Sequence, residues 1–199
     1  MLRTNYVLID YENVQPADLE TLHVPQVHVL LFVGANQTKI SVDIVMALQA
    51  MEGSGRIVRC SANGPNALDF HIAYYCGEIV TQDKNAFLHI VSRDTGFDPL
   101  IAHMKGQKVF AQRVESIAQI SFLQAVHAKS PGERVALVLA HFRKGVSRPR
   151  SLKTLSSTIS AVFRKALSEQ EVEAVVAELQ KRKAVTVENG KLVYAIEAA

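Results

Sequence analysis

Acidic side chains stand at separated points in the first half of the chain, and two of them come just after apolar, strand-like runs. Asp10 ends the run YVLID, with Glu12 and Asn13 after it, and Asp94 follows a second such run. Open α/β sheets bind ligands at the C-terminal ends of their parallel strands, so we expect these carboxylates at one crevice. Crowded carboxylates repel one another unless a cation neutralises them. Oxygen ligands of this kind favour Mg²⁺ or Mn²⁺ over zinc.

Two further acids extend this group. Asp69 lies early in the helix-like run ALDFHIAYYCGEIVT, on the otherwise apolar stretch before Phe70. Asp98 follows Asp94 by four residues, about one helical turn, so both can point at one site. A divalent ion held by such carboxylates orients a water as nucleophile and stabilises the leaving oxygen of a phosphodiester.

Each acid also has an ordinary structural explanation. Asp94 is the residue type that caps a helix N-terminus, and Asp98 is favoured by the dipole of the helix that it begins. Glu12 suits a solvated loop. These alternatives are weakest for Asp69, because a solvated Asp is unexpected among apolar neighbours.

The elements that must position these acids alternate between two periodicities. β-type runs occupy residues 6–10, 27–34, 56–62, 87–92 and 108–113, and helical patterns occupy residues 41–51, 67–81, 97–106 and 116–128. Strands separated by helices predict right-handed crossovers and a mostly parallel sheet covered on both faces. The predicted fold class is therefore α/β, a Rossmann-like three-layer arrangement.

The chain changes character at Ser130-Pro131-Gly132, a breaker cluster that predicts a linker between domains at residues 1–129 and 133–199. Helical patterns at 133–145, 151–167 and 168–183 precede strand-like runs at 184–187 and 191–196. Asn189-Gly190 between the two runs is a strong hairpin signal, and Ser168 with Glu171 forms a capping-box pattern. Three helices and a terminal hairpin predict a small winged-helix-like α+β domain.

The charge of the two parts differs. Residues 1–132 hold 10 Lys and Arg against 12 Asp and Glu, a net charge of −2, and residues 133–199 hold 12 against 7, a net charge of +5. Part of the excess is a basic segment without an acid among its members, which suits a polyanion such as nucleic acid. A solvated basic face is the alternative. The basic segment consists of Arg143, Lys144, Arg148, Arg150, Lys153, Arg164 and Lys165.

Three stretches, VLIDYENV, LDFHIAYYCGEI and HIVSRDTGFDPLI, together resemble the signatures of the PIN-like nuclease superfamily, in particular its NYN branch. The resemblance covers roughly residues 5 to 112, with the three stretches in the family's order. It implies Mg²⁺- or Mn²⁺-dependent ribonuclease activity. It also implies metal-binding roles for Asp10, Asp69, Asp94 and Asp98, with Asn13 as a polar neighbour that orients water or substrate.

The third stretch departs from the family pattern. Arg93 follows Ser92 where the commoner version has Gly, and Gly96 precedes Phe97 where the commoner version has an acid. The number of bound ions, one or two, therefore stays open.

Rival α/β chemistries fit less well. An aspartyl phosphatase needs Asp-x-Asp after the first strand, where this chain has Glu12, and no Gly-rich phosphate loop is present. A receiver domain needs a Lys after its last strand, whereas Lys108 lies within the strand pattern. The histidines fall in helix or strand patterns and give no support to a nucleophilic triad.

The sequence as a whole predicts a metal-dependent endoribonuclease whose C-terminal domain holds nucleic acid, with RNA favoured by the resemblance. The alternative is a non-catalytic nucleic-acid-binding or scaffold protein with a vestigial acidic site. A homodimer, or a protein partner docked on the C-terminal domain, is also open. No apolar run reaches membrane-span length, the start MLRTNYVLID leaves no room for a signal peptide, and Cys60 and Cys76 suit buried thiols, so we expect a cytoplasmic protein.

Overall fold

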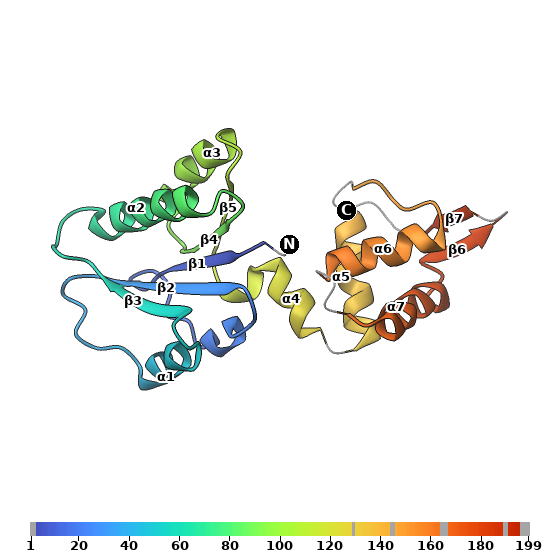
Figure 1. Ribbon diagram of the computed structural model, residues 1–199, viewed down its shortest axis with the longest axis horizontal. Coiled ribbons are helices and arrows are strands. Elements are labelled where there is room, and N and C mark those ends of the chain that lie inside the picture. Colours follow the sequence, from blue (N-terminus) through green and yellow to red (C-terminus); the bar gives the residue numbers. More distant parts are fainter. Residues whose placement is uncertain (1–2, 129, 144–145, 164–166, 189–190, 196–199) are drawn as a thin grey trace. The chain divides into compact units, whose positions relative to one another are not determined.

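Apolar, β-branched runs form a five-stranded parallel sheet in the first part of the chain (Figure 1). Its strands lie in the order β3-β2-β1-β4-β5, with every neighbouring pair parallel. Their bounds are β1 (Asn5–Asp10), β2 (Val27–Val33), β3 (Gly55–Arg59), β4 (Phe87–Val91) and β5 (Phe110–Val114). After β1, the chain adds β2 and β3 on one side of that strand, and it then adds β4 and β5 on the other side. The junction of β1 and β4 is therefore the topological switch point, where ligands bind in such sheets.

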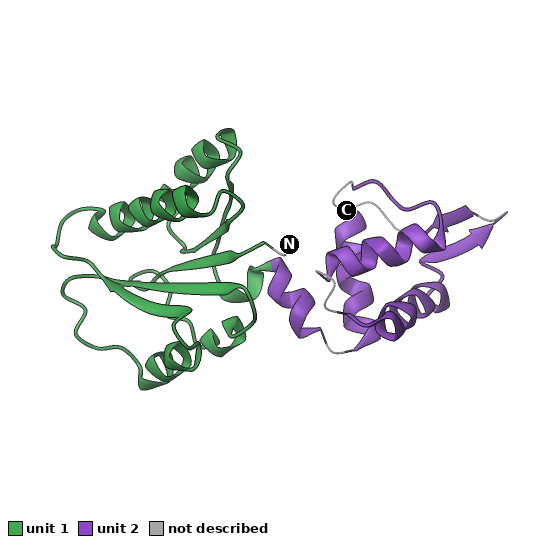
Figure 2. Ribbon diagram, in the orientation of Figure 1, with its two compact units in different colours: residues 1–120 green, residues 121–199 purple. Residues whose placement is uncertain are grey.

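This computed structural model describes residues 3–128, 130–143, 146–163, 167–188 and 191–195. It divides into two compact units, residues 1–120 and 121–199 (Figure 2). No helix within the described ranges is both long and apolar enough to cross a membrane.

Helices cover both faces of the sheet in the first unit. Figure 1 shows α2 (Ala67–Gln82) and α3 (Asp98–Gly106) on one face and α1 (Val42–Ala50) on the other. Short 3-10 helices η1 (Leu19–Leu22), η2 (Thr95–Phe97) and η3 (Ile117–Gln119) occupy the connections. The predicted α/β class, a mostly parallel sheet flanked by helices, is confirmed.

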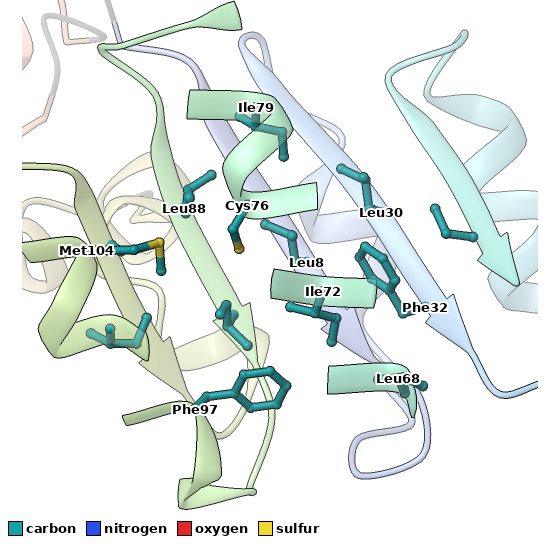
Figure 3. Packing of buried hydrophobic residues seen from close by; sticks show 14 of the residues in the cluster. Leu8, Leu30, Phe32, Leu68, Ile72, Cys76, Ile79, Leu88, Phe97 and Met104 are labelled. Carbon is teal, nitrogen blue, oxygen red and sulfur yellow. The ribbon is translucent and has the colours of Figure 1, made fainter. Parts of the chain in front are cut away.

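The core beneath α2 fixes that helix against the central strands (Figure 3). Leu68, Ile72, Cys76 and Ile79 recur at helical spacing and are all buried. They pack in one cluster with side chains of β1, β2 and β4. Burying a side chain the size of Ile72 contributes roughly 1.5–3 kcal/mol, and this packing sets where the first turn of α2 lies.

The described residues of the second unit form four helices and a two-stranded antiparallel sheet. Its elements are α4 (Ser121–His127), α5 (Pro131–Arg143), α6 (Leu152–Val162), α7 (Glu169–Lys181), β6 (Val185–Glu188) and β7 (Lys191–Tyr194). Val138, Phe142, Leu155 and Ile159 belong to its buried core. The predicted small α+β arrangement of helices and a C-terminal strand pair is present. The Asn189-Gly190 turn lies outside the described residues.

The predicted capping box at the start of α7 is confirmed. The Ser168 hydroxyl accepts the Glu171 backbone N–H at 3.3 Å, and the Glu171 carboxylate accepts the Ser168 N–H at 2.8 Å. Two of the N–H groups that a helix start leaves unpaired are thereby satisfied.

Two local predictions were wrong. Residues 116–128 form η3 and α4 instead of one helix, because Ile120 between them adopts an extended backbone conformation. The predicted linker residues Pro131 and Gly132 form the first turn of α5. Proline is well tolerated at the first position of a helix, where its missing N–H leaves no bond unmade. The boundary between the two units falls after residue 120, before the predicted linker, because Ala125 and Ala128 pack into the second core.

Candidate active site

Asp10 ends the central strand β1 and is fully buried, at 0% exposure. One carboxylate oxygen accepts hydrogen bonds from the Ser92 hydroxyl and the Asn13 side-chain amide, both at 2.7 Å. The other accepts the backbone N–H groups of Glu12 and Asn13 at 3.2 Å. These neutral donors satisfy the buried carboxylate. They fix its direction at the C-terminal end of β1.

Ser92, directly after β4, connects Asp10 to Asp94. Its hydroxyl donates to Asp10 and accepts the Asp94 backbone N–H at 3.0 Å. Asp94 in turn caps η2, with its Oδ1 accepting the Gly96 N–H at 2.7 Å. The capping role and the position near Asp10 are therefore both present. Among the described residues, no group donates a hydrogen bond to the second oxygen of Asp94.

Asp69 lies half-buried in the first turn of α2. Its pKa is raised by burial and then by the negative charges of Asp10, Asp94 and Glu12. The same negative charges act on a neighbouring thiol. The pKa of Cys60 is raised by burial and then by the charges of Glu12, Asp10 and Asp69. Side chains from three separate stretches of the sequence thus concentrate negative charge at the switch point of the sheet.

Glu12 belongs to this group through a close approach to β2. A Cβ atom added at Gly34, just after β2, would overlap the Glu12 carboxylate. Glu12 and Gly34 also line a pocket of about 190 Å³ with Cys60 and Asn66, beside the first turn of α2. The sequence predicted Glu12 on a loop, where an acid is ordinarily solvated. The signal for it was a glycine at the end of the predicted strand 27–34.

The carboxylates are grouped without forming a ready-made coordination sphere. Within the described ranges, no three His, Cys, Asp or Glu side chains are arranged so that they could hold a metal ion. The donor set still suits a hard divalent cation, because its members are carboxylates, and the pKa of Asp69 is raised by burial and then by the charges of the other three. Asp10, Asp69 and Asp94, with Glu12, are the residues that would hold such an ion.

Asp98 is not brought into this group. Its carboxylate accepts two hydrogen bonds from the Arg113 guanidinium, at 2.7 and 3.3 Å. The hydrogen bond from Arg113 lowers the pKa of Asp98. Arg113, at β5, also donates to the Ser92 carbonyl oxygen at 3.1 Å. Arg113 was not among the predicted site residues, and its only signal in the sequence was a cationic residue at the end of the last predicted strand.

The basic segment lies in the second unit. Arg143, Arg148, Arg150 and Lys153 are exposed, and the structure places no acidic side chain in an ion pair with these four within the described residues. Lys144, Arg164 and Lys165 lie outside the described residues.

The loop before α6 is bonded to the terminal strand β7. The Tyr194 hydroxyl donates to the Pro149 carbonyl at 2.7 Å, and the Leu192 N–H donates to the Arg150 carbonyl at 3.2 Å. The Arg148 guanidinium lies 5.8 Å from the centre of the Tyr194 ring. Arg148 and Arg150 therefore extend from a backbone that is held in place.

Comparison with known proteins identifies the first unit. A family model described as a PIN domain matches residues 4–114, which contain all the carboxylates of the site. No curated protein and no solved structure matches the chain. The family match covers more than half of the 199 residues, and the chain therefore belongs to the PIN domain family.

Proposed function

We propose that this protein is a metal-dependent endoribonuclease of the NYN type, with Mg²⁺ or Mn²⁺ held by Asp10, Asp69 and Asp94. PIN domains are generally metal-dependent nucleases. The observation that carries the proposal for this chain is the Ser92 hydroxyl, which bonds the buried Asp10 carboxylate and the Asp94 backbone and so brings two acids together at the switch point. The pKa of Asp69 is raised by burial and then by the charges of Asp10, Asp94 and Glu12, which agrees with this grouping. Without a cation these charges oppose one another, and a divalent ion relieves the repulsion.

The residues of the chain divide the work at this site. Asn13 and Ser92 hold Asp10 in one orientation, so this carboxylate is preorganised before substrate arrives. Asp94 offers its second oxygen from the η2 cap, and Asp69 offers its carboxylate from the first turn of α2. A bound divalent ion supplies Lewis acidity and lowers the pKa of a water for attack on the phosphodiester.

Asp98 has a different role in this proposal. Because Arg113 binds both Asp98 and the Ser92 carbonyl, Asp98 acts on the site by holding that arginine in place. We assign Asp98 as a positioning residue instead of a metal ligand.

The second unit is proposed as a winged-helix-like module that holds nucleic acid through the basic segment. Helix α7 of this unit exposes Glu169 and Glu173, which repel phosphates. Three exposed cations of the basic segment, Arg148, Arg150 and Lys153, lie on the loop before α6 and on the first turn of that helix. The two free cysteines are both buried and suit a reducing compartment, which supports a cytoplasmic location.

Cleavage of labelled single-stranded RNA with Mn²⁺ tests the proposal. We expect wild type to cleave and a chelator to stop cleavage. Asp94→Asn and Asp10→Asn should lower the rate on the order of 10²-fold or more, as loss of a preorganised charged group does. Asp83→Asn is the matched control, because Asp83 caps the far end of α2 from Asp69. Single-stranded DNA of the same sequence, assayed in parallel, tests the preference for RNA.

One observation favours a second candidate function, a nucleic-acid-binding or scaffold protein with a vestigial site. It is the absence of a ready-made metal arrangement among the described His, Cys, Asp and Glu side chains. In that case RNA binds without being cleaved, and Asp10→Asn and Asp94→Asn behave like wild type.

A further inference from the structure

Helix α2 exposes two aromatic side chains to solvent. Phe70 and Tyr74 are each 69% exposed, although aromatic side chains ordinarily bury most of their large surface. They are four residues apart, so they neighbour each other on one face of the helix. This face points away from the buried side of α2, which carries Leu68, Ile72 and Cys76.

This aromatic pair adjoins the acidic site. Phe70 directly follows Asp69, so the pair begins in the same helical turn as one of the carboxylates. The Tyr74 ring contacts the Tyr75 ring edge-on, with 5.6 Å between the ring centres. Tyr75 in turn contacts the buried Phe32 ring edge-on at 5.3 Å. The outermost ring is therefore supported by a chain of rings that reaches the core.

The helix surface beyond the pair is open and carries no cation. Gly77, one turn after Tyr74, is exposed, and a Cβ atom added there would meet nothing within 4 Å. The sequence of α2 contains neither lysine nor arginine. Attraction of phosphates by charge is thus absent from this helix, and the flat faces of its two rings are what it offers a ligand.

We propose that Phe70 and Tyr74 form a stacking platform for unpaired bases of a single-stranded nucleic acid whose phosphodiester enters the acidic site. The inference rests on the proposed function. Base–aromatic stacking tolerates any sequence, because every base has a π-face. Bases inside a duplex are already stacked and paired, so the platform selects single strands.

The chemistry of the rings separates this surface from another apolar one in the same unit. Helix α1 lies on the opposite face of the sheet (Figure 1). It exposes Val42 at 73% and Met46 at 59%. Those side chains are aliphatic and have no π-face. Met46→Ala therefore removes a similarly exposed apolar side chain without touching the platform, and it serves as the matched control.

Fluorescence anisotropy with the full chain, in the presence of chelator so that nothing is cleaved, tests the platform. The probes are a labelled single-stranded RNA, its duplex, and an abasic strand with the same backbone. We expect Phe70→Ala and Tyr74→Ala each to weaken single-strand binding roughly 5- to 100-fold. The ring-retaining Phe70→Tyr and Tyr74→Phe, and Met46→Ala, should bind like wild type. Binding of the abasic strand should be unchanged in every variant.

Three results would overturn the platform. One is unchanged single-strand binding in the double variant Phe70→Ala/Tyr74→Ala. Another is an equal loss of affinity for the abasic strand. The last is a change from dimer to monomer on size exclusion caused by the double variant, which would assign the rings to contact with a second copy of the chain. Because the readout is binding without cleavage, failure of the platform is distinguishable from failure of the nuclease proposal.

Discussion

Ser92 is the residue on which the geometry of the site depends most directly. A single hydroxyl bonds the buried Asp10 carboxylate and the backbone of Asp94, so it joins the ends of β1 and β4 across the switch point. Removing a hydrogen-bond donor from a buried carboxylate costs more than the average hydrogen bond contributes, because the charged group is left under-satisfied. The position of both acids therefore depends on a neutral, fully buried side chain.

The ion pair of Asp98 predicts a pH dependence. Arg113 lowers the folded-state pKa of Asp98 below its ordinary value of 3.8. The stability from this pair is therefore present above the ordinary pKa and is lost as the pH falls through the folded pKa. Asp98→Asn should lower the urea midpoint at pH 7, and the difference from wild type should shrink on acidification below about pH 4.

The same variant separates the two roles considered for Asp98. As a positioning residue, Asp98 should leave measurable cleavage when replaced by Asn, well above that of Asp94→Asn. Equal loss of activity in the two variants, together with a urea midpoint that does not respond to pH, would contradict the positioning role.

At the level of single residues, the sequence predicted where the acids lie along the chain but not that Asp98 forms an ion pair with Arg113. The ends of β1 and β4 could be located because apolar runs stop there, which placed Asp10 and Asp94 on one edge of the sheet. Asp98 was grouped with them on its four-residue spacing alone. Its partner Arg113 comes from the neighbouring strand β5, and strand order is not encoded in helical or strand periodicity.

Among the elements, α2 links the core to the site. Its buried side carries Ile72 at 0% exposure, and its first turn carries Asp69. Its outward side carries the exposed aromatic pair. One helix thus supplies packing, a carboxylate and a candidate binding surface from three faces, and the packing of the buried face fixes the other two.

Truncating a side chain on the buried face of α2 should measurably lower the stability of the first unit. Ile72→Ala is expected to lower the free energy of unfolding by about 2–5 kcal/mol, because it removes buried methyl groups and leaves a cavity. Urea denaturation provides the measurement. The control is Thr81→Ala on the exposed side of α2, which should change stability by less than about 0.5 kcal/mol. Equal effects of the two substitutions would contradict the role assigned to this packing.

The elements themselves were largely predictable, and the exceptions have a common physical cause. Apolar residues continue at helical spacing through residues 116–128, yet the backbone of Ile120 is extended. The Ile120 side chain is nevertheless fully buried, at 0% exposure, so an apolar residue at this position does not require a helical backbone. Ser130, Pro131 and Gly132 suit both a loop and a helix start. Local residue preferences do not choose between those outcomes, and packing in the second core does.

Over the whole molecule, acidic and basic residues divide between the two units. Residues 1–120 hold 9 Lys and Arg against 12 Asp and Glu, and residues 121–199 hold 13 against 7. The first unit therefore repels phosphates overall, and the proposed affinity for the nucleic-acid backbone must come from the second.

This division predicts which substitutions change the salt dependence of RNA binding. Replacing Arg148, Arg150 and Lys153 by Ala should weaken binding and flatten the plot of log affinity against log salt by roughly 0.7 per side chain for a single strand. Lys181→Ala/Arg182→Ala is the control, since both side chains pair with Glu178. An unchanged slope in the triple variant would remove the basic segment from the binding surface.

The central claim is that carboxylates from three stretches of the chain share a divalent cation at the switch point of the sheet. Anomalous diffraction from crystals soaked in Mn²⁺ tests it most directly, because the signal locates the ion itself. We expect a manganese peak between the carboxylates of Asp10, Asp69 and Asp94, absent in Asp94→Asn. A manganese-saturated crystal without a peak among these three side chains would contradict it.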